Sequence, residues 1–368
     1  MTKARLYYID NLRIFLISLV VLLHLNITYG APGDWYYNES SAEMPALLFQ
    51  AMFNITNQAF FMGMFFMISA YFTAGSIQRK STGKFVTDRL IRLGIPLAIF
   101  YFILQALTVW INYHFIRNDD ASLWNFIWKY RVWGFGPLWF VEALLIFTFL
   151  LLIFRRSLLN IRISFPGTRL IILSALIVGL IQFLIRLRFH VGWSIPHTNL
   201  QLPFFIQYIV LFVVGIIAYQ NNWLDSIDFK LGKRWFIFAQ IMIMIVLPTF
   251  LYFGGKENGM DPFLGGMTWQ NFAWAIWEQV TGFALIIGLL GLAKKYANRQ
   301  GKLAKALSDS AYGVFVFHAP IIVGISALLV GFSVPQLLKF VIVAPIAMLV
   351  AFLFAWLIKQ LPLLKRIF

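Results

Sequence analysis

The sequence predicts an all-α protein, a polytopic membrane bundle of about ten helices with both termini in the cytoplasm. Of its 368 residues 61% are hydrophobic and only 12% are charged, a balance that a soluble domain of this length does not need. The apolar residues also gather in runs long enough to cross about 30 Å of hydrocarbon as helices. We therefore expect one integral-membrane domain over residues 1–368, with no separate soluble domain.

Ten apolar runs are long enough to span a bilayer. If the N-terminus lies inside, the inner segments hold 23 of the 30 Lys and Arg residues, which places both termini in the cytoplasm. The first run follows basic residues, as a signal peptide does, but it carries Arg13 and His24 and has no clear small-residue cleavage site, so we expect it to be retained. The predicted helices cover approximately 12–30, 46–75, 94–113, 137–154, 170–187, 203–220, 235–253, 270–293, 310–331 and 335–358.

Composition narrows the classes of function. The net charge of +16 would suggest a nucleic-acid partner in a soluble domain, but here the basic residues lie in short segments between apolar runs, where orientation in the membrane explains them better. The absence of cysteine excludes disulfides, thiolate metal sites and a cysteine nucleophile. The histidines show no metal-ligand spacing, and neither a serine elbow nor a Gly-rich phosphate loop is present. Catalysis would therefore be assembled from several helices, without a metal.

Arg13 and His24 are the most informative pair in the chain. Eleven residues at about 100° each make about three turns, so both side chains lie on one face of the first helix, about 16 Å apart along its axis. Asp10 falls within about 60° of Arg13, whereas Ser18 and Asn26 point elsewhere. The polar stripe on this side is interrupted by Ile17, Val20 and Val21. Ionisable groups inside a membrane are costly and usually face a cavity or a partner. Either residue alone fits snorkelling or helix packing, but together they favour an intramembrane site.

Segment 79–92 is the densest basic cluster. Arg89 and Arg92 are one helical turn apart, so their guanidinium groups can project to one side and bind phosphate in a bidentate manner. Arg79 and Lys84 belong to the same cluster. Basic residues beside a membrane helix also serve topology and anionic lipids. The paired spacing favours the alternative, a docking site for a phosphorylated cytosolic donor such as coenzyme A.

Further polar residues lie inside predicted helices and are candidate pocket residues. Those on the second helix share one face, and interhelical hydrogen bonds would also explain them. The carboxylates must be protonated, paired or turned to a cavity, with a His or Arg as the obvious partner, but the sequence does not pair them. The candidates are Asn54, Gln58, Ser69, Glu142, Glu278 and His318. Tryptophan-rich outer segments fit either an interfacial belt or a surface that stacks on sugars.

Four stretches between residues 7 and about 322 carry a resemblance to a known family: YYIDNLRIFLISLVVLLH, FFMGMFFMISAYFTAGSIQRKSTGKFVTDRLIRLGIP, GPLWFVEALLIF and SAYGVFVFHAPII. They resemble the signatures of the acyltransferase-3 family of multi-pass membrane acyltransferases, most closely the glucan succinyltransferase branch. The resemblance implies transfer of an acetyl or succinyl group from a cytoplasmic acyl-CoA to a hydroxyl of a carbohydrate or other cell-envelope acceptor, across the bacterial cytoplasmic membrane. It implies that Arg13 and His24 are catalytic and that Arg89 and Arg92 are the paired arginines of the cytoplasmic face.

The chain departs from the family pattern in two places. Ala70 stands where glycine is commoner, and nothing resembles the extracytoplasmic hydrolase-like domain of some members. We therefore expect the chain to act alone or with an unidentified extracytoplasmic partner.

The resulting hypothesis places the chemistry in one groove that holds Arg13 and His24 and opens to the cytosol. The pantetheine arm of acyl-CoA would enter this groove between the first two helices. His24 would act as a general base or carry the acyl group, with Arg13 fixing the donor and Asp10 grouped with them.

Two other classes of function use the same residues. A secondary transporter of an anionic or glycosylated solute could bind its substrate or relay protons through them, although we see no repeat between the halves and no paired broken helices. In an assembly subunit they would only lock helices together, which does not require a basic pair at the mouth of a polar seam.

Overall fold

The computed structural model describes residues 5–44, 46–196, 198–256, 259–362, 364–365 and 367. Within these ranges the secondary structure is helical, without strands, and ten spans are long and apolar enough to cross a membrane. The prediction of a multi-pass helical protein is confirmed. The spans are Tyr7–Thr28, Ala46–Arg79, Thr82–Ile116, Gly136–Leu159, Thr168–Arg186, Leu202–Gln220, Phe229–Gly255, Trp269–Tyr296, Lys302–Leu328 and Gln336–Gln360.

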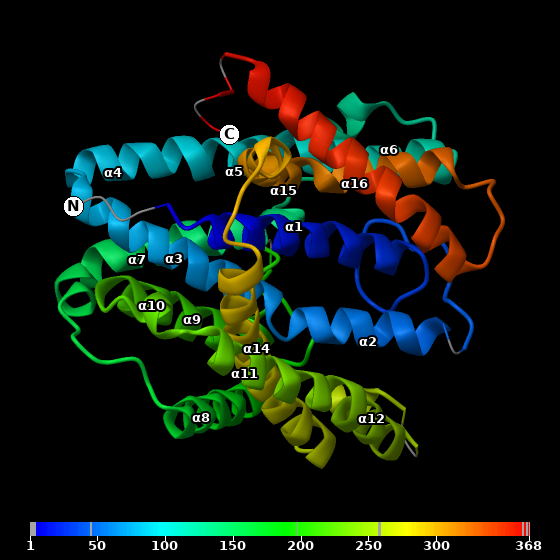
Figure 1. The fold of residues 1–368 in the computed structure, drawn as a ribbon. Coiled ribbons are helices and arrows are strands. Elements are labelled where there is room, and N and C mark those ends of the chain that lie inside the picture. Colours follow the sequence, from blue (N-terminus) through cyan, green and yellow to red (C-terminus); the bar gives the residue numbers. More distant parts are fainter. Residues whose placement is uncertain are drawn as a thin grey trace.

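Helix α1 (Tyr7–Thr28) lies in the middle of the bundle (Figure 1). Its apolar side chains are buried around most of its circumference; Leu16, Val21 and Leu25 have no exposed surface. The helix that carries Arg13 and His24 is therefore surrounded mainly by protein rather than by lipid. The helices that pack against it are α2 (Ala46–Gln58), α3 (Phe61–Arg79), α14 (Trp269–Tyr296), α15 (Lys302–Leu328) and α16 (Gln336–Gln360).

The second span is broken, whereas the sequence predicts one helix over 46–75. Helix α2 ends before Ala59, and α3 begins after Phe60. The Ala59 carbonyl accepts a hydrogen bond from the Gln207 side chain at 2.8 Å, and Gly282 of α14 packs directly against the same carbonyl. The turn between α2 and α3 thus exposes a backbone acceptor that α9 (Leu202–Gln220) uses. The polar face predicted to continue along the whole helix is interrupted there.

The third span begins at residue 82 rather than 94, so Arg89 and Arg92 lie within its first turns. It contains three π-helical turns, a feature often found at functional sites. At the first of these turns, the carbonyl of Arg92 accepts a hydrogen bond from the Tyr312 hydroxyl at 2.8 Å, which joins this span to α15. The segments are α4 (Thr82–Arg89), η1 (Leu90–Gly94), α5 (Ile95–Ile99), η2 (Phe100–Leu104), α6 (Gln105–Ile111) and η3 (Asn112–Ile116).

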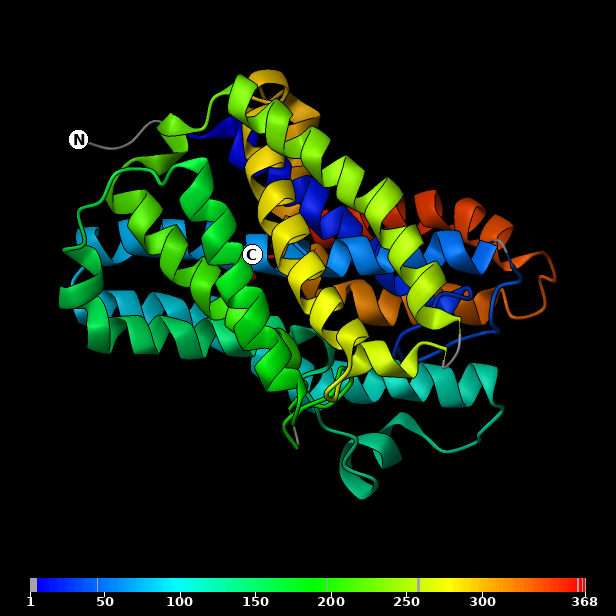
Figure 2. The ribbon, with the colours of Figure 1, turned by 90° about the horizontal axis from the view of Figure 1, so that it is seen from below.

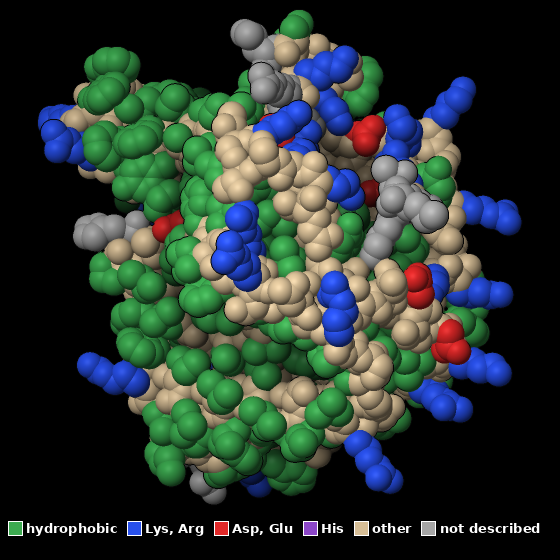
Figure 3. Space-filling view, turned by 90° about the vertical axis from the view of Figure 1, so that its left-hand side faces the viewer, with side chains coloured by type: hydrophobic (Ala, Val, Ile, Leu, Met, Phe, Trp, Pro, Cys, Tyr) green, Lys and Arg blue, Asp and Glu red, His purple; other side chains and the backbone are tan. Residues whose placement is uncertain are grey.

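The remaining helices surround this centre. Helix α14 crosses the bundle at a steep angle, and the segment after η3 projects from one end of the molecule (Figure 2). Lys and Arg side chains are spread over the face at which α1 begins, the face predicted to be cytoplasmic (Figure 3). These helices are η4 (Asn125–Lys129), η5 (Gly136–Leu138), α7 (Trp139–Leu159), α8 (Thr168–Arg186), α10 (Trp223–Ser226), α11 (Phe229–Ile241), η6 (Met242–Val246), α12 (Leu247–Gly255) and α13 (Asp261–Leu264).

Candidate active site

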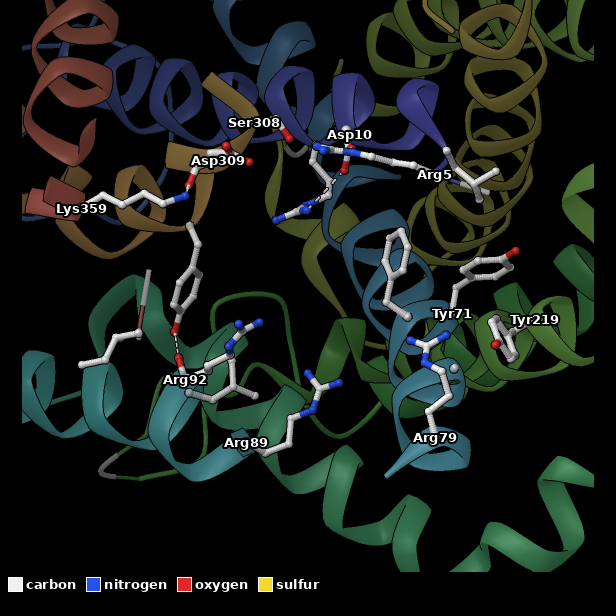
Figure 4. Close-up of a pocket in the computed structure, with 17 residues that line it drawn as sticks. Arg5, Asp10, Tyr71, Arg79, Arg89, Arg92, Tyr219, Ser308, Asp309 and Lys359 are labelled. Atoms are coloured by element: carbon white, nitrogen blue, oxygen red, sulfur yellow. Dashed lines mark hydrogen bonds and ion pairs between the residues drawn. The ribbon is translucent and has the colours of Figure 1, made fainter. Parts of the chain in front are cut away.

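A cavity of about 520 Å³ lies beside the first turns of α1 and is lined by six basic and two acidic side chains. In Figure 4 the guanidinium groups of Arg79, Arg89 and Arg92 point from one side toward Asp10 and Asp309 on the other. The excess of cations in a concave site favours an anionic ligand. The polar lining residues are Arg5, Asp10, Arg13, Tyr71, Arg79, Arg89, Arg92, Tyr219, Ser308, Asp309, Tyr312 and Lys359.

Asp10 and Arg13 are neighbours at the wall of the cavity. Asp10 accepts a hydrogen bond from Arg5 Nε at 2.7 Å, and its other oxygen lies 3.7 Å from Arg13 Nη1. The hydrogen bond to Asp10 raises the pKa of Arg5, so that side chain stays charged. Asp10 is thus shared between two guanidinium groups, and its place in the structure is that of an orienting partner for Arg13.

Three of the four basic residues predicted to bind the donor line this cavity: Arg79, Arg89 and Arg92. The paired spacing predicts that the last two project to one side, and the structure brings both to the cavity. Lys84 is exposed on the solvent side of α4 and is not among the lining residues. Lys359 of α16 also lines the cavity but was not predicted as a donor-binding residue, because α16 comes to lie beside α15 only in the folded bundle. Its ammonium donates a hydrogen bond to the Asp309 carbonyl at 2.8 Å.

His24 pairs with His318 of α15 inside the bundle. His318 Nε2 lies 3.2 Å from His24 Nδ1, while His318 Nδ1 lies 2.7 Å from the carbonyl oxygen of Phe315. A carbonyl can only accept, so Nδ1 of His318 carries a proton and, in the neutral ring, Nε2 is the acceptor. His24 must then carry its proton on Nδ1. This tautomer leaves a lone pair on His24 Nε2, available to a proton or an acyl carbon.

Trp35 covers the imidazole of His24. The two rings are stacked with centroids 3.9 Å apart and planes 19° apart. His318 lies beside His24, with ring centroids 5.0 Å apart, and its own centroid is 6.0 Å from that of Trp35. His318 is fully buried, His24 is partly buried, and the indole N–H of Trp35 is buried without an acceptor within the described ranges. The stack holds the plane of the His24 ring, so the direction of its Nε2 lone pair is fixed.

The cavity and the histidine pair are separate, which corrects the prediction of a single groove. On α1 the lining of the cavity ends at Arg13, about 16 Å below His24 along the helix axis. Ile17, Val20 and Val21 occupy the turns between them and are at most 2% exposed. The sequence already places these side chains on the shared face, but only the packed structure shows that they close it.

The polar residues of the second span contact different helices. Asn54 accepts a hydrogen bond at 2.8 Å from Asn26 of α1, a residue that was not among the predicted site residues. The Gln58 amide donates to the Tyr208 hydroxyl at 3.2 Å. Ser69 lies beyond the break, on α3. Asn54 and Gln58 therefore join helices, and neither lines the cation-rich cavity.

The two candidate carboxylates occupy different environments. Glu142, in the first turn of α7, has one carboxylate oxygen buried without a hydrogen-bond donor within the described ranges. Glu278 is 3% exposed and pairs with Arg186 of α8 at 2.8 Å, while Gln182 donates to the same oxygen at 2.9 Å. The sequence predicts an Arg or His partner for such a carboxylate. It could not identify Arg186 as that partner, because Arg186 lies at the end of its predicted helix, where a charged residue is ordinary.

Truncating Glu278 to alanine is expected to lower the free energy of unfolding by about 3–5 kcal/mol, because it leaves the Arg186 charge buried and uncompensated. Denaturation of the purified protein in detergent measures this change. Replacing Glu278 and Arg186 together by methionine removes both charges and should recover most of the loss. Equal stability of the single variant and the wild type would show that the pair does not hold α8 to α14.

Comparison with known proteins places the chain in a family. The model of the acyltransferase-3 family, described as an acyltransferase domain, matches residues 6–359. "Glucans biosynthesis protein C" of Escherichia coli O1:K1 is 22% identical over 334 residues, which cover 86% of this chain and 82% of that protein. The proteins of that name from Escherichia coli K12 and Shigella dysenteriae serotype 1 are each 21% identical over the same length. No solved structure matches the chain.

The family match covers nearly the whole chain and includes the two paired histidines and every lining residue of the cation-lined cavity except Arg5 and Ile367. This chain is a multi-pass membrane acyltransferase of the acyltransferase-3 family.

Proposed function

We propose that this chain transfers an acyl group from acyl-CoA, bound from the cytoplasm, to a hydroxyl of a carbohydrate of the bacterial cell envelope. The observation that carries the proposal is that one helix, α1, presents Arg13 to a cation-lined cavity and His24 to a second histidine deeper in the bundle. The name of the relatives, glucans biosynthesis protein C, supports a carbohydrate acceptor.

The nucleotide end of acyl-CoA fits the cavity in size and charge. Arg89 and Arg92 supply planar donors for phosphate oxygens, and Arg79 and Lys359 add positive charge from other helices. A volume of about 520 Å³ lies within the range of small-molecule and cofactor sites. Of the predicted residues, Lys84 has no part in this proposal, since it does not line the cavity.

The thioester must reach His24 from this cavity, past the closed turns of α1. Ile17, Val20 and Val21 fill that path, so binding of the donor has to move the helices that pack on them. A path that closes behind the thioester keeps water away from the reacting carbon, which protects the acyl group from hydrolysis.

The histidine pair supports acyl transfer in a defined proton order. His24 Nε2 takes the proton of the acceptor hydroxyl while the oxygen of that hydroxyl bonds to the thioester carbon. The carbon–sulfur bond then breaks, and the proton passes from His24 to the departing CoA sulfur. His318 Nε2 accepts the hydrogen bond from His24 Nδ1 throughout and stabilises the imidazolium.

A covalent route is compatible with the same geometry. His24 Nε2 would attack the thioester carbon and release CoA as a thiolate. The oxygen of the acceptor hydroxyl would then bond to the acyl carbon and displace the imidazole, and the hydroxyl proton would pass through the freed Nε2 to the CoA sulfur. Acyl-CoA breakdown without acceptor, together with label on His24, distinguishes this route from direct transfer.

Proteoliposomes test the proposed function. Labelled acetyl-CoA or succinyl-CoA is supplied outside, and a glucan oligosaccharide is trapped inside. The proposal predicts label on the trapped sugar in the presence of acyl-CoA. Absence of label with both donors, combined with uptake of solute driven by an ion gradient without acyl-CoA, would support a transporter instead.

Replacing His318 by leucine is expected to lower kcat by up to about 10⁴-fold, the loss seen when the residue that orients a catalytic histidine is replaced. The affinity for acyl-CoA should not change, because His318 lies outside the cavity. Initial rates at saturating donor and equilibrium binding measure the two quantities. His318→Gln, whose side-chain oxygen can still accept from His24 Nδ1, should retain more activity than His318→Leu; equal losses would contradict the assigned tautomer.

A further inference from the structure

The segment that follows α1 folds back over the histidine pair. Its backbone returns to the end of α1 through hydrogen bonds from Glu39 N to the Thr28 carbonyl at 3.0 Å and from Ala42 N to the Gly30 carbonyl at 3.3 Å. We call residues 29–44 the cap. Trp35, near its centre, stacks on His24 and is not among the residues that line the cation-lined cavity.

The cap is tied to the last helix by a buried ion pair. The Lys339 ammonium has no exposed surface and donates to both Glu39 oxygens at 2.7 Å and to the Leu329 carbonyl at 2.8 Å. Beside it, the Gln336 amide donates to the Ser40 hydroxyl at 2.8 Å. All three protons of the ammonium are therefore satisfied, and the outer half of the cap is fixed to the start of α16.

A second tie joins the cap to the third span. The Tyr36 hydroxyl donates to the Gln105 side chain, and the Asn112 amide donates to the Tyr36 carbonyl. Burial raises the pKa of Tyr36, so its hydroxyl remains a donor. Gly136, with a φ of +45°, packs so closely on this hydroxyl that a Cβ there would overlap it. Gly136, the first residue of the GPLW sequence at the start of the fourth span, thus packs against Tyr36 of the cap.

We propose that the acceptor reaches His24 from the far side of the membrane by displacing the cap, and that the sugar takes the place beside His24 that Trp35 now occupies. This inference rests on the proposed function. Trp35 covers the face of the His24 imidazole at stacking distance. A hydroxyl that bonds to Nε2 lies in the plane of that ring, and the sugar ring that carries it then needs the space over the imidazole that Trp35 fills. The buried indole N–H, which has no acceptor within the described ranges, then becomes a donor for a sugar oxygen.

Two glycines allow the cap to move at its base. Gly30 and Gly33 have φ values of +112° and +155°, backbone conformations that residues other than glycine rarely adopt. A Cβ on Gly30 would lie 2.7 Å from Ala42 N, and one on Gly33 would lie 2.6 Å from the Ile27 side chain. Glycine at both positions permits the present close return and also other backbone angles when the cap opens.

The natural absence of cysteine allows the cap to be locked reversibly. Ser40→Cys and Gln336→Cys are combined and joined by a short bis-methanethiosulfonate reagent, which a reductant removes. We expect the joined protein to bind acyl-CoA with unchanged affinity but to transfer the acyl group to a glucan oligosaccharide at least 10-fold more slowly. Reduction should restore the rate. The two single-cysteine variants, treated with the same reagent, are the controls and should keep their activity.

The outcomes separate this inference from the proposed function. If the untreated double variant transfers acyl groups and the joined protein does so equally fast, the cap does not cover the acceptor path, and entry from the side between helices is indicated. If the wild type neither binds acyl-CoA nor labels a sugar, the proposed function itself fails. A second variant, Trp35→Ala, should raise acceptor-independent hydrolysis of acyl-CoA several-fold by admitting water to His24; unchanged hydrolysis would contradict the covering role of Trp35.

Discussion

Replacing His24 by alanine is expected to lower acyl transfer by about 10²–10⁴-fold, the contribution typical of a positioned general base. Affinity for acyl-CoA should stay at the wild-type value, because His24 does not line the cavity that holds the proposed donor site. The loss follows from the removal of the one ring nitrogen whose lone pair is free in the paired tautomer. Steady-state transfer and equilibrium donor binding on the same preparation measure both effects.

His114 provides a matched control for His24. Like His24, it stacks on a tryptophan, Trp110, with ring centroids 5.0 Å apart. Its Nδ1 lies 2.9 Å from the backbone carbonyl oxygen of Asp119. It lies at the end of the third span, in η3, away from both α1 and the cavity. His114→Ala should therefore keep full transfer activity. If His24→Ala also keeps it, the base or acyl carrier is a different residue.

Replacing Arg89 and Arg92 together by alanine is expected to weaken acyl-CoA binding by about 10²–10⁴-fold. Each guanidinium makes charge-assisted hydrogen bonds worth about 1.5–3 kcal/mol, and the two losses together correspond to this change in Kd. Added salt should weaken binding to the wild type more than binding to the double variant, because fewer charges remain to be screened. Isothermal titration with acyl-CoA, at two salt concentrations, measures both changes.

Lys84→Ala is the control for the arginine pair. Lys84 belongs to the same basic segment and carries the same charge, but it is exposed and lies outside the cavity. Its removal should change Kd by less than about two-fold, as expected for an exposed charge. An equal loss in Lys84→Ala and in the arginine variant would mean that the net charge of the segment, rather than the cavity, attracts the donor.

The number of spans could be predicted from the sequence, because a bilayer imposes a length and an apolar composition on every helix that crosses it. The break at Ala59 and Phe60 could not, since it depends on Gln207 and Gly282, more than 140 residues away in the chain. The third span illustrates the same limit, because its π-helical turns are stabilised by partners such as Tyr312 on a later helix.

The sequence identified candidate residues of the site, but it could not predict which of them contact one another. The helical wheel places Arg13 and His24 on one face, which is a local property of α1. His318 lies 294 residues from His24, and only the packing of α15 on α1 brings the two rings together. The same packing buries Ile17, Val20 and Val21, which the helical wheel already places on this face, so the structure does not contain the single groove that the hypothesis assumed between Arg13 and His24.

The central claim is that the donor binds at the arginine cavity and reacts at the histidine pair, two places joined by α1. A single-turnover experiment tests this separation of binding from reaction. Excess His24→Ala protein is mixed with labelled acyl-CoA and a glucan oligosaccharide. The amounts of bound donor, free CoA and labelled sugar are then measured over time. If the donor binds and reacts at these two separate places, the variant binds as much acyl-CoA as the wild type but releases CoA at least 100-fold more slowly. Release at the wild-type rate, or loss of binding in this variant, would contradict it.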